Sequence, residues 1–116
     1  MTLTPASFAR TLADPTRLRI LMLLNASDEL CVCELTAALD LPQPKISRHL
    51  AILRETEMLL DRRKGTWVYY RIHPKLPAWA LDALAAVAGG CTGTQPYAQD
   101  SERLASLSQG ATGTCE

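Results

Sequence analysis

Features that would place this chain among membrane proteins, secreted proteins or thiol enzymes are missing. It has no hydrophobic run long enough to cross a membrane, and residues 1–5 show no basic region that leads into an apolar stretch. It also lacks the Cys-x-x-Cys pair, the βαβ pattern and the phosphate-binding loop of a small reductase. We therefore expect a cytoplasmic protein that is not an enzyme and has no membrane partner. Its four cysteines are expected to stay reduced rather than to form a disulfide framework.

The chain also lacks net charge, which at first argues against a nucleic-acid partner. The charges are segregated, however. Residues 43–75 hold eight Lys/Arg and three acidic residues, a net charge of +5, so the rest of the chain carries −5. A basic face on a neutral protein suits DNA binding with limited non-specific affinity.

Apolar periodicity predicts four helices in the first half of the chain. The first covers residues 6–13, and Asp14-Pro15 caps and opens the second, which is apolar enough to be central and buried. The third runs over 33–39, and the fourth starts at Gln43 after a break at 40–42. Two helices joined by so short a break are typical of a helix-turn-helix.

At 100° per residue the fourth helix has two distinct faces. One face packs inward and consists of Ile46, Leu50 and Leu53. The opposite face can enter a DNA groove and holds Lys45, Arg48, His49 and Ile52. A charged helix face is usually only solvated, but the helix-turn-helix context favours DNA contact here. Arg48 is the candidate for a base contact, because a guanidinium can pair with guanine through two hydrogen bonds.

A period of two then predicts a hairpin, with strands over 59–63 and 66–72 joined by Lys64-Gly65. Its basic tip is expected to meet phosphates or the minor groove and consists of Arg62, Arg63 and Lys64. The predicted fold class is therefore mainly α, a winged helix-turn-helix with a two-stranded β wing.

The C-terminal part divides into an apolar helix and a polar tail. The helix covers residues 77–88, ends at Gly89-Gly90 and exposes more apolar surface than one small core can hide, so a homodimer through the terminal helices is expected. We assign residues 1–88 to a DNA-binding and dimerisation domain and 89–116 to a flexible tail, with room for a short helix over 100–107.

Cys31 and Cys33 precede the DNA-reading helix by about ten residues. On its own, a Cys-x-Cys pair more often consists of two buried cysteines that pack as small hydrophobic residues. The start of a helix, however, favours the thiolate form of cysteine, which is the form that binds soft ions. Residues two apart do not face each other on a regular helix, so joint capture of one ion needs a non-helical turn or unwinds one. That distortion would move the recognition helix, which predicts antagonism between ion and DNA.

Four segments, residues 12–21, 29–35, 43–53 and 65–71, together resemble the ArsR/SmtB family of metal- and metalloid-sensing repressors, most closely its arsenic-responsive branch. The resemblance implies a dimeric repressor on operator DNA that dissociates when trivalent arsenic or antimony binds. It implies no cofactor for folding or DNA binding. Gln43 and Ser47 match family positions that approach bases or phosphates.

The chain departs from the family pattern at Thr36, where arsenic-responsive relatives often carry a third cysteine. Since trivalent arsenic prefers three thiolates, the site is either two-coordinate or completed by Cys91 or Cys115 from either subunit. Other sensor sites of the family lack their ligands here, which leaves arsenic. A DNA-binding redox sensor, in which Cys31 and Cys33 oxidise, stays open as the alternative.

Overall fold

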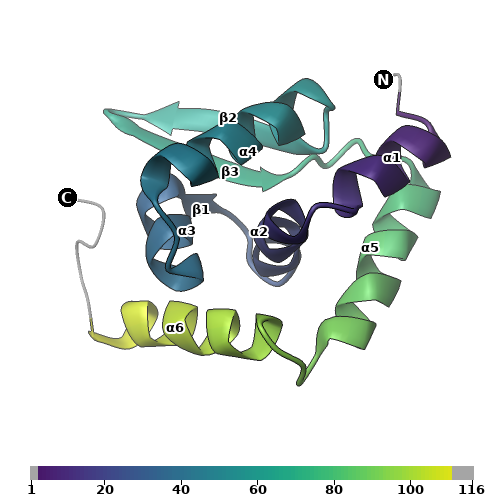
Figure 1. The fold of residues 1–116 in the computed structure, drawn as a ribbon. Coiled ribbons are helices and arrows are strands. Elements are labelled where there is room, and N and C mark those ends of the chain that lie inside the picture. The colour runs from purple at the N-terminus through teal and green to yellow at the C-terminus, as the bar shows by residue number, and fades with distance from the viewer. Residues whose placement is uncertain (1–2, 111–116) are drawn as a thin grey trace.

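Among the described residues, the helices and three short strands follow one another in the order of a winged helix-turn-helix, which confirms the predicted fold class (Figure 1). This computed structural model describes residues 3–110. The helices are α1 (Pro5–Leu12), α2 (Pro15–Asn25), α3 (Val32–Leu39), α4 (Gln43–Glu55), α5 (Ala78–Cys91) and α6 (Tyr97–Gly110). The strands are β1 (Leu30–Cys31), β2 (Leu59–Lys64) and β3 (Trp67–Ile72). Among the described residues, no helix has the length and apolar character needed to span a membrane.

Helix α2 lies at the centre and packs against α3, α4, α5 and α6 (Figure 1). It starts as predicted, because the Asp14 carboxylate accepts the Arg17 N–H at 3.0 Å and Pro15 lies in the first turn. Residues 20–24 are all buried, so little of the helix meets solvent. The second half of α2 therefore forms the middle of the hydrophobic core.

Helices α3 and α4 form the predicted helix-turn-helix. The turn begins at Asp40, which ends α3 in the left-handed conformation with φ 54°. Helix α4 then starts at Gln43, as the sequence predicts. Its predicted inward residues Ile46, Leu50 and Leu53 are at most 1% exposed, so this helix buries the face that its periodicity indicates and leaves the other for a partner.

The wing is one hairpin of a three-stranded antiparallel sheet in the order β1-β3-β2. Lys64 pairs with Trp67, so the turn is Gly65-Thr66 rather than Lys64-Gly65 as predicted. The shift follows from Gly65, whose φ of +64° suits the first position of a two-residue hairpin turn. Strand β1 was not predicted, because two residues are too few to show a period, and it pairs Cys31 with Tyr69.

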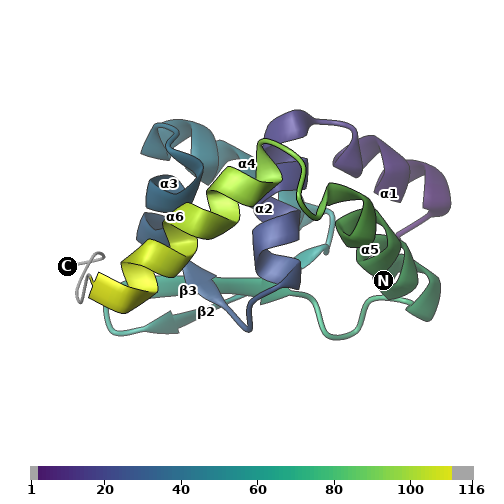
Figure 2. The same cartoon turned by 90° about the horizontal axis from the view of Figure 1, so that it is seen from below.

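The structure corrects the expected C-terminal organisation. Helix α5 continues through Gly89-Gly90 to Cys91 instead of ending at residue 88. Residues 97–110 then form α6, which lies across α3 and α2 when the molecule is seen from below (Figure 2). The flexible tail predicted for 89–116 is therefore wrong for residues up to 110, and its last six residues lie outside the described part.

Candidate functional site

The outward face of α4 presents the predicted DNA-reading residues, with one exception. Gln43, Ser47 and Arg48 are exposed, and Lys45 is partly exposed. Ile52 is 39% exposed on the same helix. Two turns of this helix therefore offer an amide, a hydroxyl and two cations to a groove, a combination that can contact both base edges and phosphates.

His49 is the exception. Its side chain is only 16% exposed, and its Nε2 lies 3.9 Å from an Asp14 carboxylate oxygen at the start of α2. Burial lowers the pKa of His49, although Asp14 opposes that shift. The structure thus turns this imidazole toward the protein rather than toward a groove, because α2 begins beside this part of α4. Within the described residues its Nδ1 is buried without a hydrogen-bond partner.

All three basic residues of the wing are exposed, but Arg62 is also paired with a carboxylate. Arg62 donates Nε–H to Glu29 Oε2 at 2.8 Å, makes a second contact with the other oxygen, and lies 5.2 Å above the Tyr69 ring. The hydrogen bond from Arg62 lowers the pKa of Glu29. Arg63 and Lys64 are exposed beside the turn, so these two remain the wing's candidates for phosphate contact.

Cys31 and Cys33 lie on the two sides of the start of α3. Cys31 is the N-cap with extended backbone (φ −87°, ψ 168°) and belongs to β1, while Cys33 lies in the first helical turn. The backbone at Cys31 is therefore non-helical, one of the two geometries that joint capture of an ion requires. Both residues line one pocket of about 230 Å³. The rest of its lining is Val32, Gln43, Thr66, Trp67 and Val68.

Two acidic residues beside the cysteines were missed from the sequence. Glu34 Oε1 accepts the Cys31 N–H at 3.0 Å and so holds the N-cap in place. The Cys-x-x-Glu spacing is that of a capping box and was the available signal. Glu29 has no such signal, because its partner Arg62 is 33 residues away.

Among the described residues, Cys31 and Cys33 are the candidate thiol ligands that the structure brings to one pocket. Within residues 3–110 no group of three or more His, Cys, Asp or Glu side chains is placed to hold a metal ion. Cys91 is free and lines a different pocket of about 260 Å³, where α2 ends and α6 begins. Cys115, the other candidate third ligand, lies outside the described residues. Within residues 3–110, the buried hydroxyl of Thr36, one helical turn after Cys33, has no hydrogen-bond partner.

Cys31 and Cys33 do not pair with each other. Cys33 is free, whereas Cys31 is disulfide-bonded. A disulfide between Cys31 and Cys33, one way in which these two residues of a redox sensor could oxidise, is therefore not formed. The expectation that all four cysteines stay reduced is also not met at Cys31, so both thiols become available to an ion only after reduction.

Comparisons with known proteins identify the family. The profile of the bacterial regulatory protein arsR family matches residues 14–59. The chain is 59% identical over 78 residues to the arsenical resistance operon repressor of Escherichia coli, covering 67% of each chain. This chain belongs to the arsR family. Its members are transcriptional regulators with a DNA-binding helix-turn-helix, which confirms that the chain is not an enzyme.

Two further relatives agree with this assignment. The arsenic resistance transcriptional regulator ArsR1 of Pseudomonas putida is 61% identical over 82 residues, 71% of this chain. That match spans 63% of ArsR1, just under two thirds of its length. The crystal structure of the antimony-specific transcriptional repressor AntR superposes with a TM-score of 0.62 at 31% identity, covering 78% of this chain and 83% of AntR. Sequence and fold thus agree on the family.

Proposed function

We propose that this chain is a repressor that binds operator DNA as a homodimer and dissociates when reduced Cys31 and Cys33 capture trivalent arsenic or antimony. One observation carries the proposal: the two cysteines share a pocket with Gln43, the first residue of α4, and with the start of β3 in the wing. An ion bound there lies between α4 and the wing, the two elements that would contact DNA. The relatives named for arsenic and antimony resistance support the choice of ion. Such a repressor would act in the cytoplasm.

The thiol pair can act on the wing through the sheet. Cys31 pairs with Tyr69 on β3, and Tyr69 pairs in turn with Arg62 on β2. In this proposal, closing the two sulfur atoms onto one ion shifts the N-cap from its present position, although the non-helical backbone at Cys31 already lets both cysteines line one pocket. That movement would strain the β1–β3 pairing as well as the start of α4.

In this proposal the recognition helix supplies sequence readout and the wing supplies affinity. Arg48 is assigned to a base edge, and Gln43, Lys45 and Ser47 to bases or phosphates at the groove edge. Arg63 and Lys64 are assigned to phosphate, and Arg62 only once it leaves Glu29. His49 is assigned a structural role beside Asp14 instead of the DNA contact that the sequence predicts.

The proposed dimer surface is the outer face of α5 together with α1. Trp79 and Leu81 are each 39% exposed, and Asp82 is the only charged residue in α5. The Trp79 ring packs edge-on against Phe8 of α1, with ring centroids 5.3 Å apart. A face of this composition on the surface of a small domain suits a second copy of the chain. Two recognition helices would then enter successive major grooves about 34 Å apart on an inverted repeat.

The test is operator binding, followed by fluorescence anisotropy while arsenite is titrated into reduced protein. We expect release from the wild type and from Cys91→Ser, and none from the Cys31→Ser/Cys33→Ser double variant. Release that survives in the double variant would remove the thiol pair from the mechanism. Loss of release in Cys91→Ser would add that cysteine to the site.

The disulfide at Cys31 supports a second candidate function, sensing of oxidants. Operator binding measured with and without a peroxide, in the absence of arsenite, separates the two. Oxidant-driven release that Cys33→Ser retains and Cys31→Ser abolishes would favour this candidate.

A further inference from the structure

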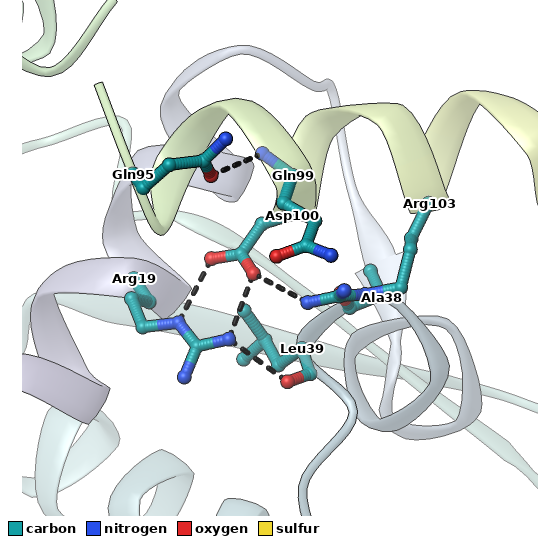
Figure 3. A network of polar contacts seen from close by, with 7 residues as sticks. All are labelled: Arg19, Ala38, Leu39, Gln95, Gln99, Asp100 and Arg103. Carbon is teal, nitrogen blue, oxygen red and sulfur yellow. Dashed lines mark hydrogen bonds and ion pairs between the residues drawn. The ribbon is translucent and has the colours of Figure 1, made fainter. Parts of the chain in front are cut away.

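A buried ion-pair cluster joins α6 to the C-terminal end of α3. Asp100 of α6 is 1% exposed, and its two oxygens accept hydrogen bonds from Arg19 of α2 at 2.7 and 2.9 Å. Arg103, one turn further along α6, donates to the same carboxylate at 3.0 Å. The hydrogen bonds that Asp100 accepts raise the pKa of Arg19. Figure 3 shows the carboxylate between the two guanidinium groups.

Both arginines also bind the last backbone carbonyls of α3 (Figure 3). Arg19 donates to Leu39 O at 2.8 Å, and Arg103 donates to Ala38 O at 2.6 Å. The last carbonyls of a helix have no partner inside the helix, and cations there are favourable. We call Arg19, Asp100 and Arg103 the α3 clasp. It fixes the end of α3 that leads directly into the turn before α4.

The clasp and the cysteines occupy opposite ends of one short helix. Helix α3 has eight residues, about two turns and 12 Å. Cys31 and Cys33 lie at its start, and the clasp holds its last two residues. Unless its first turn unwinds, a helix this short moves as a rigid body. A displacement at the cysteines therefore strains the hydrogen bonds of the clasp at the other end.

We propose that the α3 clasp sets the ion concentration at which the repressor releases DNA, by holding the sensor helix in its ion-free position. This inference rests on the proposed function of the cysteines. An interaction made only in the ion-free arrangement opposes ion binding and favours the DNA-binding form. Weakening the clasp therefore makes the ion more effective. Asp100, Arg19 and Arg103 act as positioning residues, since none of them lines the thiol pocket.

The test compares Asp100→Asn and Arg103→Ala with Glu102→Gln. Glu102 is an exposed acid on the same helix, so its substitution matches the charge change without touching the clasp. Arg103→Ala is the milder variant, because it leaves the Arg19–Asp100 pair in place and remains informative if Asp100→Asn fails to fold. For each reduced protein, operator affinity without ion, the arsenite midpoint for release and the thermal midpoint of unfolding are measured.

We expect the arsenite midpoint of Asp100→Asn to fall about fivefold or more, the lower end of usual coupling between sites. Arg103→Ala should shift it in the same direction by less, and Glu102→Gln should leave it unchanged. A lower unfolding temperature with an unchanged or higher arsenite midpoint would overturn the proposal, because α6 would then only add stability. Absence of release from the wild type would remove the proposed function, and the clasp's role with it, a result distinct from an unchanged midpoint.

Discussion

The pairing of Arg62 with Glu29 makes the three basic residues of the wing unequal in DNA binding. Arg63 and Lys64 are exposed, whereas the Arg62 guanidinium already has a carboxylate within hydrogen-bond distance. Each phosphate neutralised by a protein cation contributes about −0.9 to the slope of log Kobs against log salt concentration. In a dimer, Arg63→Ala removes two such contacts, so the slope should become shallower by about 1.8.

Arg62→Ala should change the slope by less than half as much, because the Glu29 charge already compensates this arginine. Glu29→Gln should do the opposite and steepen the slope, since it frees one cation in each subunit. The assay is operator binding by fluorescence anisotropy over a series of potassium chloride concentrations, with the unfolding midpoint of each variant as a control for folding. Equal losses in Arg62→Ala and Arg63→Ala, together with no effect of Glu29→Gln, would refute this reasoning.

Three further predictions concern stability, ion affinity and assembly. Because burial lowers the folded-state pKa of His49, the unfolded state binds its proton first. Stability should therefore fall as the pH drops below about 6.5, and His49→Gln should flatten that profile in thermal melts; an unchanged profile in this variant would contradict the prediction. Thr36→Cys places a third thiol one turn from Cys33 and removes no side-chain hydrogen bond seen among the described residues, so half-release should need less arsenite; an arsenite midpoint equal to that of the wild type would count against a third ligand on this face of α3. Leu81→Lys should give monomers by light scattering, and an intact dimer would exclude this face of α5.

The recognition helix could be predicted in detail because its determinants are local. Its apolar residues recur at helical spacing, and Ile46, Leu50 and Leu53 are buried accordingly. The Asp14 cap likewise needs only the next three residues. Periodicity predicts on which face of a helix a side chain lies, but not which other element of the protein packs against that face. His49 was therefore assigned to DNA, although the start of α2 covers it.

Helix α6 could be predicted only in part: the sequence allows a short helix over 100–107, but it indicates neither the full length of α6 nor its packing against α3. Its segment is polar, and its most buried side chain is a carboxylate, which by composition belongs on the surface. Asp100 is buried because Arg19, 81 residues earlier, neutralises it. Strand β1 depends on a partner just as distant, since two residues become a strand only by pairing with β3. The lining of the thiol pocket could not be predicted for the same reason. The wing residues that line it are distant in sequence from the start of α3 and reach it only in the folded chain.

The measurement that tests the central claim most directly is the affinity of the reduced protein for arsenite, determined once free and once saturated with operator DNA. If ion and DNA act on the same rearrangement, operator DNA must weaken arsenite binding by the same factor by which arsenite weakens operator binding, because coupling between two ligands is reciprocal. We expect equal factors, both greater than one, in the wild type, and no arsenite binding to Cys31→Ser/Cys33→Ser with or without operator. Equal arsenite affinity with and without operator would contradict the account, because the thiol pair would then bind its ion without affecting DNA.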